Sequence, residues 1–484
     1  MLAAAISRLA RGSLIYGVGS VLQRCMSLLL LPLFTRYLSP QDFGVVSLIS
    51  VLGVLLSGVL SLGSGNSLGL LYYQETYLNR RASLLWSNTL MLAANCLLWL
   101  CFVWICAGSL SRLMFQRDTF APLICLSLAG VMFGVVAEPW LSYLRMEDKA
   151  KKYVAITLCS SLSSILCSIW FVSGLEYGAS GVIAAGVIAQ ALTLGISLFS
   201  LVRTMPFHID LSACYSLVKI GLPSIFGLFA FLLIDYADRQ LMERMISLDA
   251  VGVYSVGYTL GMAINVGVGA FSAAWPPFFM AYINKPDEAR IIFGRVLSYY
   301  VLLFGLIVVA LFAFAKPAVL LLTAPNFHAA ATVVGLTAAA YMLKGCYLIC
   351  LPGVYFAHRL YLQSAVEWVA ALVNIGLCFA LIPPYGLIGA AWATLVSYLT
   401  LPVLAWVVSR PYLKVDYEGG RLARIVISVL AVSAGIFCYS TYSTIGPLVL
   451  LSIGATISGF FTLLMFLFVL TGSERRAIRT WLKR

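Results

Sequence analysis

The sequence predicts an all-α polytopic membrane protein of about fourteen transmembrane helices. Of its 484 residues, 62% are hydrophobic and only 10% are charged, whereas soluble globular proteins carry roughly 25% charged residues. Uncharged runs of 18 or more residues recur from end to end, and each can cross a hydrocarbon core of about 30 Å as a helix. These runs are apolar all round, which excludes the alternating pattern of β-barrel strands.

The apolar runs define the expected helices in chain order. The first run, from Gly12 to Thr35, is too long for a signal-peptide core and lacks a small-residue cleavage site, so we interpret it as a transmembrane helix. The fourteen expected spans are 12–35, 43–70, 84–107, 120–144, 154–174, 180–202, 220–245, 250–281, 296–315, 329–356, 361–382, 387–408, 425–442 and 447–471.

Positive charges sort sharply between the connections of these spans. Of the 31 lysines and arginines, 23 fall on the side that carries both termini and five on the other. The positive-inside rule makes the first side cytoplasmic. The net charge of +13 is therefore a topology signal, and we expect no nucleic-acid partner. A multi-pass protein of a bacterial cytoplasmic (inner) membrane with both termini in the cytoplasm is predicted.

An internal repeat appears when the chain is shifted by 208 residues. Residues 9–53 and 217–261 share eleven identities without a gap, among them Gly44/Gly252, and the same offset returns far downstream as Tyr177/Tyr385. Because each half would hold an even number of helices, the halves would have the same orientation. We expect an N-terminal six-helix lobe at 1–212, a C-terminal six-helix lobe at 213–412, and two appended helices with a basic tail at 413–484.

Three motifs carry a resemblance to a known family. The motifs are Arg36-Tyr37-Leu38-Ser39-Pro40 with Phe43-Gly44, Ala274-Trp275-Pro276-Pro277-Phe278, and Pro383-Pro384-Tyr385-Gly386-Leu387-Ile388-Gly389. In these motifs the chain resembles Wzx-type polysaccharide and O-antigen flippases, which belong with multidrug/toxin extruders and peptidoglycan-precursor flippases to the multidrug/oligosaccharidyl-lipid/polysaccharide (MOP) superfamily. The resemblance covers essentially the whole chain.

The resemblance implies that the chain moves a lipid-linked oligosaccharide across the membrane. Its substrate would be carried on undecaprenyl diphosphate and would pass from the cytoplasmic to the outer leaflet by alternating access, driven by H⁺ or Na⁺, for O-antigen, capsule or exopolysaccharide synthesis. Membrane lipids would be its surroundings, and the polymerase and chain-length machinery of the pathway would be further partners. In relatives that flip lipid-linked sugars, two extra helices guide the lipid tail.

Cations inside the spans are the candidate substrate ligands. Arg24 lies about twelve residues, or roughly 18 Å, from either end of its span, too far for its side chain to reach the interface. It sits where the resemblance implies a cavity-lining arginine, and a guanidinium can donate two hydrogen bonds to a diphosphate. With Arg239 and Lys344 it would form a cationic chamber. The alternative is a structural ion pair between helices.

Acidic residues inside the spans are candidates for ion coupling or for charge neutralisation. Asp235 and Asp238 would bind a proton or sodium, or would only neutralise Arg239; Asp235, Arg239 and Glu243 share one helix face by their spacing.

Two further acids lie nearer the cytoplasm. Glu367 is expected to meet Lys344 and is a third coupling candidate, and Glu138, beside Pro139, is a candidate gate residue.

Two other function classes stay open. A membrane polymerase or ligase would need a base or a metal, but three scattered histidines and no HExxH or GxxxxGK[ST] motif favour no enzyme, no catalytic residue, no metal and no cofactor. A multidrug extruder would favour acids in the first lobe, where this chain has a central arginine instead. The sequence names neither the sugar unit nor the coupling ion.

Overall fold

Helices make up all the regular structure in the residues that the structure describes. This computed structural model describes residues 19, 21–23, 26, 30–75, 77–442 and 445–468. The α-helices are α2 (Pro40–Leu60), α3 (Ser64–Gln74), α4 (Leu78–Phe115), α5 (Ala121–Met146), α6 (Ala150–Ile169), α7 (Gly178–Thr204), α8 (Leu211–Met245), α9 (Leu248–Gly261), α10 (Asn265–Met280), α11 (Pro286–Leu322), α12 (Ala331–Cys350), α13 (Pro352–Phe356), α14 (Leu360–Ser409), α15 (Gly419–Tyr442) and α16 (Pro447–Phe468). The predicted all-α class is confirmed.

The number of membrane crossings agrees with the prediction. Within the described ranges, eleven helical segments are long and apolar enough to cross a membrane. The 50-residue α14 would extend about 75 Å if straight, but Gly386 interrupts it with φ 57° and ψ −129°, so it supplies two spans. The 35-residue α8 is long enough for another. Most of the first expected span, 12–35, lies outside the described residues.

The start of α2 explains one of the sequence motifs. The Ser39 hydroxyl accepts a hydrogen bond from the Asp42 N–H at 3.1 Å, and the Asp42 carboxylate accepts one from the Ser39 N–H, also at 3.1 Å. This reciprocal capping box satisfies backbone donors that a helix start leaves unpaired. Pro40, at the first helical position, has the φ angle that a helix needs. The single span expected at 43–70 divides into α2 and α3.

Two glycines allow a close approach between repeat-equivalent segments. A Cβ atom at Gly44 would overlap the carbonyl oxygen of Leu248, and a Cβ atom at Gly252 would overlap that of Pro40. Gly44 and Gly252 are 208 residues apart, and so are Pro40 and Leu248. The contact is thus reciprocal, as in a two-fold interface, and it has the symmetry that the predicted duplication requires.

The chain forms two compact units, Met1–Gly252 and Val253–Arg484. In the first unit α5 packs against α4 and α7, α7 against α6, and α8 against α2, α3 and α4. The predicted lobe boundary at 212/213 follows the sequence repeat and stays a prediction, since α8 packs within the first unit. Trp86, Trp140, Tyr143 and Leu217 belong to an apolar core in this unit.

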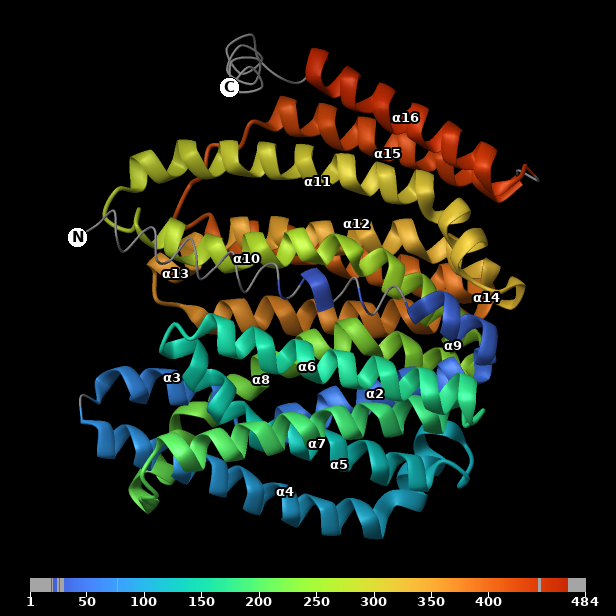
Figure 1. Ribbon diagram of the computed structural model, residues 1–484. Coiled ribbons are helices and arrows are strands. Elements are labelled where there is room, and N and C mark those ends of the chain that lie inside the picture. The colour runs from blue at the N-terminus through green and yellow to red at the C-terminus, as the bar shows by residue number, and fades with distance from the viewer. Residues whose placement is uncertain are drawn as a thin grey trace. The chain divides into compact units, whose positions relative to one another are not determined.

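In the second unit α11 is the central packing element. It contacts α12 on one side and α15 and α16 on the other, and α12 in turn packs against α14 and α10. Figure 1 shows α11, α15 and α16 running side by side. The two helices predicted as an appendage therefore form a layer on α11.

Replacement of Gly386 by alanine tests the break in α14. A Cβ atom disfavours this positive-φ conformation by about 1–3 kcal/mol, so Gly386→Ala should lower the thermal unfolding midpoint of the detergent-solubilised protein. Gly376, in the same helix with open space around its Cα, is the matched control. Gly376→Ala should raise the midpoint, since alanine is the better helix former by about 1 kcal/mol. Equal midpoints for wild type and Gly386→Ala would contradict the strained geometry.

Candidate functional site

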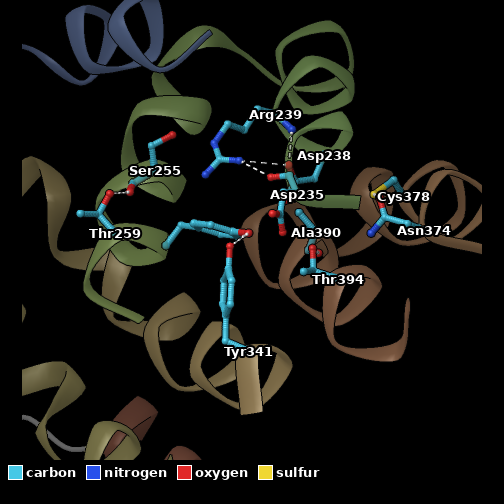
Figure 2. A network of polar contacts seen from close by, with 11 residues as sticks. Asp235, Asp238, Arg239, Ser255, Thr259, Tyr341, Asn374, Cys378, Ala390 and Thr394 are labelled. Carbon is cyan, nitrogen blue, oxygen red and sulfur yellow. Dashed lines mark hydrogen bonds and ion pairs between the residues drawn. The ribbon is translucent and has the colours of Figure 1, made fainter. Parts of the chain in front are cut away.

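A buried ion pair lies on α8 in the first unit. The Arg239 side chain is 6% exposed and the Asp238 side chain 0%, with Arg239 Nη1 3.6 Å from Asp238 Oδ1. The same guanidinium nitrogen donates to the backbone carbonyl of Asp235 at 2.6 Å, and the Arg239 N–H donates to Asp238 Oδ1 at 2.8 Å. Figure 2 shows these contacts between the three residues. Two contacts along one helix thus hold the guanidinium in a low-dielectric setting, and a backbone hydrogen bond holds the Asp238 carboxylate beside it.

The C-terminal end of α8 is tied to the C-terminal end of α4. Gln240 Nε2 donates to the Met114 carbonyl at 3.0 Å, and Arg244 Nη2 donates to the Leu113 carbonyl at 2.9 Å. Glu243, expected to share a face with Asp235 and Arg239, is 8% exposed. These contacts anchor α8 within the first unit, so its charged segment has a fixed position there.

Lys344 and Glu367 both lie in the second unit. Lys344, on α12, is half-buried, and its ammonium lies 5.7 Å from the centre of the Tyr341 ring. Glu367, on α14, is 3% exposed and accepts hydrogen bonds from the Tyr347 hydroxyl at 2.7 Å and from Gln363 at 2.9 Å. The expected meeting of Lys344 and Glu367 as a pair stays a prediction.

Arg24, the first residue of the expected cationic chamber, lies outside the described residues. Arg239 belongs to the first unit, and Lys344 belongs to the second with Glu367. The role of all three cations as substrate ligands stays a prediction, and so does ion coupling by Asp235, Asp238 and Glu367.

Glu138 borders a large cavity inside the first unit. It lies on α5 directly before Pro139, accepts a hydrogen bond from the Ser142 hydroxyl at 3.0 Å, and forms an ion pair with Arg145. The cavity measures about 790 Å³, is open to its surroundings and is lined by residues of α2, α5, α6 and α7, with Gln23 also in its wall. Glu138 as a gate stays a prediction.

Sequence reasoning missed this cavity because most of its polar walls are uncharged. Serine and threonine cost little to insert into a membrane helix, so they give no sharp signal in an apolar run. The available clue was the spacing of Ser50, Ser57 and Ser61, which places three hydroxyls on one face of α2.

A second polar cluster, in the second unit, was also missed. Asn374 is fully buried on α14, and its carboxamide oxygen accepts a weak hydrogen bond from the Cys378 thiol at 3.8 Å. Thr394, beyond the Gly386 break, donates to the Ala390 carbonyl at 3.1 Å. Figure 2 shows these residues together with Tyr341, whose hydroxyl lies 3.0 Å from that of Tyr258. The break in α14 lets its two halves contact each other, since the Ser397 hydroxyl donates to the Ala370 carbonyl at 2.7 Å.

Relatives of the chain were found by sequence. A profile of the family described as "Polysaccharide biosynthesis protein" matches residues 9–283, which is more than half of the chain. A lipid II flippase, MurJ, from Thermosipho africanus (strain TCF52B) is 31% identical over 134 residues. That alignment spans 28% of this chain and 26% of the relative.

Solved structures share the fold over most of the chain. The inward closed conformation of the lipid II flippase MurJ matches with a TM-score of 0.75 at 14% identity, covering 94% of this chain and 99% of that one. An inward-facing multidrug resistance transporter of the MATE family matches with a TM-score of 0.66 at 13% identity, covering 84% and 96%. The chain therefore belongs to the polysaccharide biosynthesis protein family, and its fold is that of these flippases and transporters.

Proposed function

We propose that this protein translocates an undecaprenyl-diphosphate-linked oligosaccharide from the cytoplasmic to the outer leaflet by alternating access. The observation that carries the proposal is the extent of the fold match. A lipid II flippase matches 94% of this chain, whereas a MATE drug transporter matches 84%. A lipid-linked substrate rather than a soluble drug is thereby favoured, and the family description supports a role in polysaccharide synthesis.

The helices α15 and α16 give this proposal a physical basis. They pack on α11 and leave large apolar side chains exposed, including Leu430, Leu448 and Phe460, each more than 60% exposed. Side chains of this kind are stable against hydrocarbon. The layer suits a long polyprenyl tail that stays in the bilayer while its head group crosses the protein.

The head group accounts for cations within the spans. A charged side chain at the bilayer centre costs at least roughly 2.5–3.5 kcal/mol on insertion scales, and an anionic ligand that contacts a cation there offsets part of this cost. Arg239 and Lys344, together with Arg24, would attract the diphosphate, and a guanidinium can contact it with two donors at once. The activity is transport, with no bond made or broken.

The setting proposed for this activity is the bacterial cytoplasmic membrane. Both termini would face the cytoplasm because the positively charged connections gather on that side. A gradient of H⁺ or Na⁺ would drive the cycle through Asp235, Asp238 or Glu367. The polymerase of the pathway would take up the substrate after translocation.

Lys344→Ala should lower surface polysaccharide at least tenfold in cells that depend on this protein. A lost charge-assisted hydrogen bond is worth about 1.5–3 kcal/mol, and Lys344→Arg, which keeps the charge, should retain most of the export. Arg112→Ala is the control, because the pair of Arg112 with Asp118 is more than half exposed. Polysaccharide would be quantified beside the membrane level of each variant. Normal export by Lys344→Ala would remove this residue from the site, and drug efflux without polysaccharide export would favour an extruder.

Asp238→Asn should destabilise the protein strongly, because it leaves Arg239 buried without its counter-charge. Breaking a buried pair costs about 3–5 kcal/mol, whereas an exposed pair contributes only about 0–1 kcal/mol. Asp118→Asn, which breaks the exposed pair with Arg112, is the matched control. Chemical denaturation in detergent would compare the two variants. A free energy of unfolding equal to that of wild type would show that Asp238 is dispensable for holding Arg239.

Glu367→Gln should remove the dependence of transport on its driving ion while leaving the fold intact. Glutamine keeps the size of the side chain and an oxygen that accepts hydrogen bonds. Its amide, however, neither binds a proton nor carries a negative charge that could hold a cation. Export would be measured in inverted vesicles with an imposed Na⁺ or pH gradient. A variant that responds to the gradient as wild type does would exclude Glu367 from coupling.

A further inference from the structure

The cavity inside the first unit is large enough to hold part of a substrate. Its volume of about 790 Å³ lies within the range of about 300–1,000 Å³ that small-molecule sites occupy. Gly186, on α7, lines it, and a Cβ atom added there would meet nothing within 4 Å. The volume is therefore open space beside the helix backbone.

The cavity wall is hydroxyl-rich and close to neutral. Among the described residues that line it, Glu138 is the one charged side chain, and Arg145 neutralises it through their ion pair. The Ser50, Ser57 and Thr193 hydroxyls donate to carbonyls of their own helices at 2.7, 2.8 and 2.9 Å. A hydroxyl oxygen also has two acceptor lone pairs, so these side chains can still accept hydrogen bonds from a ligand.

Gln190 adds hydrogen-bond donors to the hydroxyl acceptors of the cavity wall. This residue lies on α7, borders the cavity and is exposed. Among the residues that the structure describes, none forms a hydrogen bond with its side-chain amide. Gly134 leaves room for it, since a Cβ atom there would lie 3.2 Å from Gln190 Oε1. An amide offers two donors and an acceptor, which a polyhydroxylated ligand can use in both directions.

This lining selects between the three parts of a lipid-linked oligosaccharide. Among the described lining residues, a diphosphate would face mainly acceptor oxygens and a carboxylate, with no cation beyond the one already paired, so these residues disfavour it. A polyprenyl tail would have to desolvate the hydroxyls and the amide without replacing their hydrogen bonds. Neutral sugar residues carry the O–H donors and acceptors that match.

We propose that the cavity bounded by Ser50, Ser57, Glu138, Gly186, Gln190 and Thr193 binds neutral sugar residues of the lipid-linked oligosaccharide during translocation. The inference rests on the proposed function and assigns the sugar portion of the substrate to a site within the first unit alone. The cationic residues then recognise the diphosphate, and the hydroxyl-lined cavity recognises the glycan.

Gly186→Leu tests this assignment, because the new side chain fills the open volume without displacing a neighbour. Gly195→Leu is the matched control: it makes the same substitution on the same helix, also with nothing within 4 Å, at a position outside the cavity lining. Gln190→Leu is a second variant, since it removes the amide at nearly constant volume. Size-exclusion chromatography and thermal midpoints would establish that all three variants are folded.

Two probes separate the sugar from the phosphate. One is undecaprenyl diphosphate, and the other is the same carrier with its oligosaccharide, extracted from cells in which this gene is deleted. Binding to purified protein in nanodiscs is measured for both. We expect Gly186→Leu and Gln190→Leu to weaken binding of the glycosylated carrier at least tenfold and to leave binding of the bare carrier unchanged, with Gly195→Leu like wild type.

Each other outcome overturns a defined part of the proposal. If Gly186→Leu binds the glycosylated carrier as wild type does, the cavity holds only water and the sugar assignment is wrong, while the proposed function stands. If the variants weaken both probes equally, the cavity binds the diphosphate instead. If wild type binds neither probe, the proposed function fails and the assignment fails with it.

Discussion

The absence of water in the bilayer core is the constraint on which the structure depends. A charge placed there must be paired, hydrogen-bonded or exposed to an aqueous cavity. Arg239 meets this requirement on its own helix through the Asp238 carboxylate and the Asp235 carbonyl. Glu367 meets it through the Tyr347 hydroxyl and the Gln363 amide. Arg239 and Glu367 are therefore each hydrogen-bonded by residues of their own unit.

Internal satisfaction is also what a moving transporter requires. If a charge were neutralised only by a partner in the other unit, every cycle would leave it unpaired for part of the time, at a cost of several kcal/mol. In the proposed cycle Arg239 would keep Asp238 as its partner throughout, because the two residues are adjacent in sequence. A guanidinium held by one carboxylate and one carbonyl still has N–H groups to donate, so structural pairing and ligand binding are compatible at this residue.

Most of the helices could be predicted from the sequence, whereas the partners of individual side chains could not. Hydropathy depends on composition over some twenty residues, and such an average locates α4, α7 or α11 without knowledge of their neighbours. The hydropathy average merged α2 with α3 into one span, because the turn between them, near Gly63, is only about three residues long. The break at Gly386 was located correctly because two prolines and a glycine stand together there.

The candidate site was predictable only where it is charged. Spacing arguments placed Asp235 on the helix face of Arg239, four residues on, and the structure also pairs the Arg239 guanidinium with the adjacent Asp238. The i, i+4 rule describes side chains on a helix surface, and a buried guanidinium can instead fold back towards a carboxylate that its own N–H already holds. The cavity beside Gly186 had no charge signature, and only the packing of four helices creates it.

The family motifs and the substrate contacts prove to be different sets of residues. Ser39 and Pro40 begin α2, and Gly44 and Gly252 allow a reciprocal close contact between segments 208 residues apart. These roles concern how the backbone starts and packs, so a transporter of any cargo on this fold would need them. Recognition of a particular sugar depends instead on hydroxyls and an amide that can change without altering a helix. On the proposed assignment, a chain of this family can keep its motifs while the glycan that it binds changes, because different residues determine the fold and the sugar specificity.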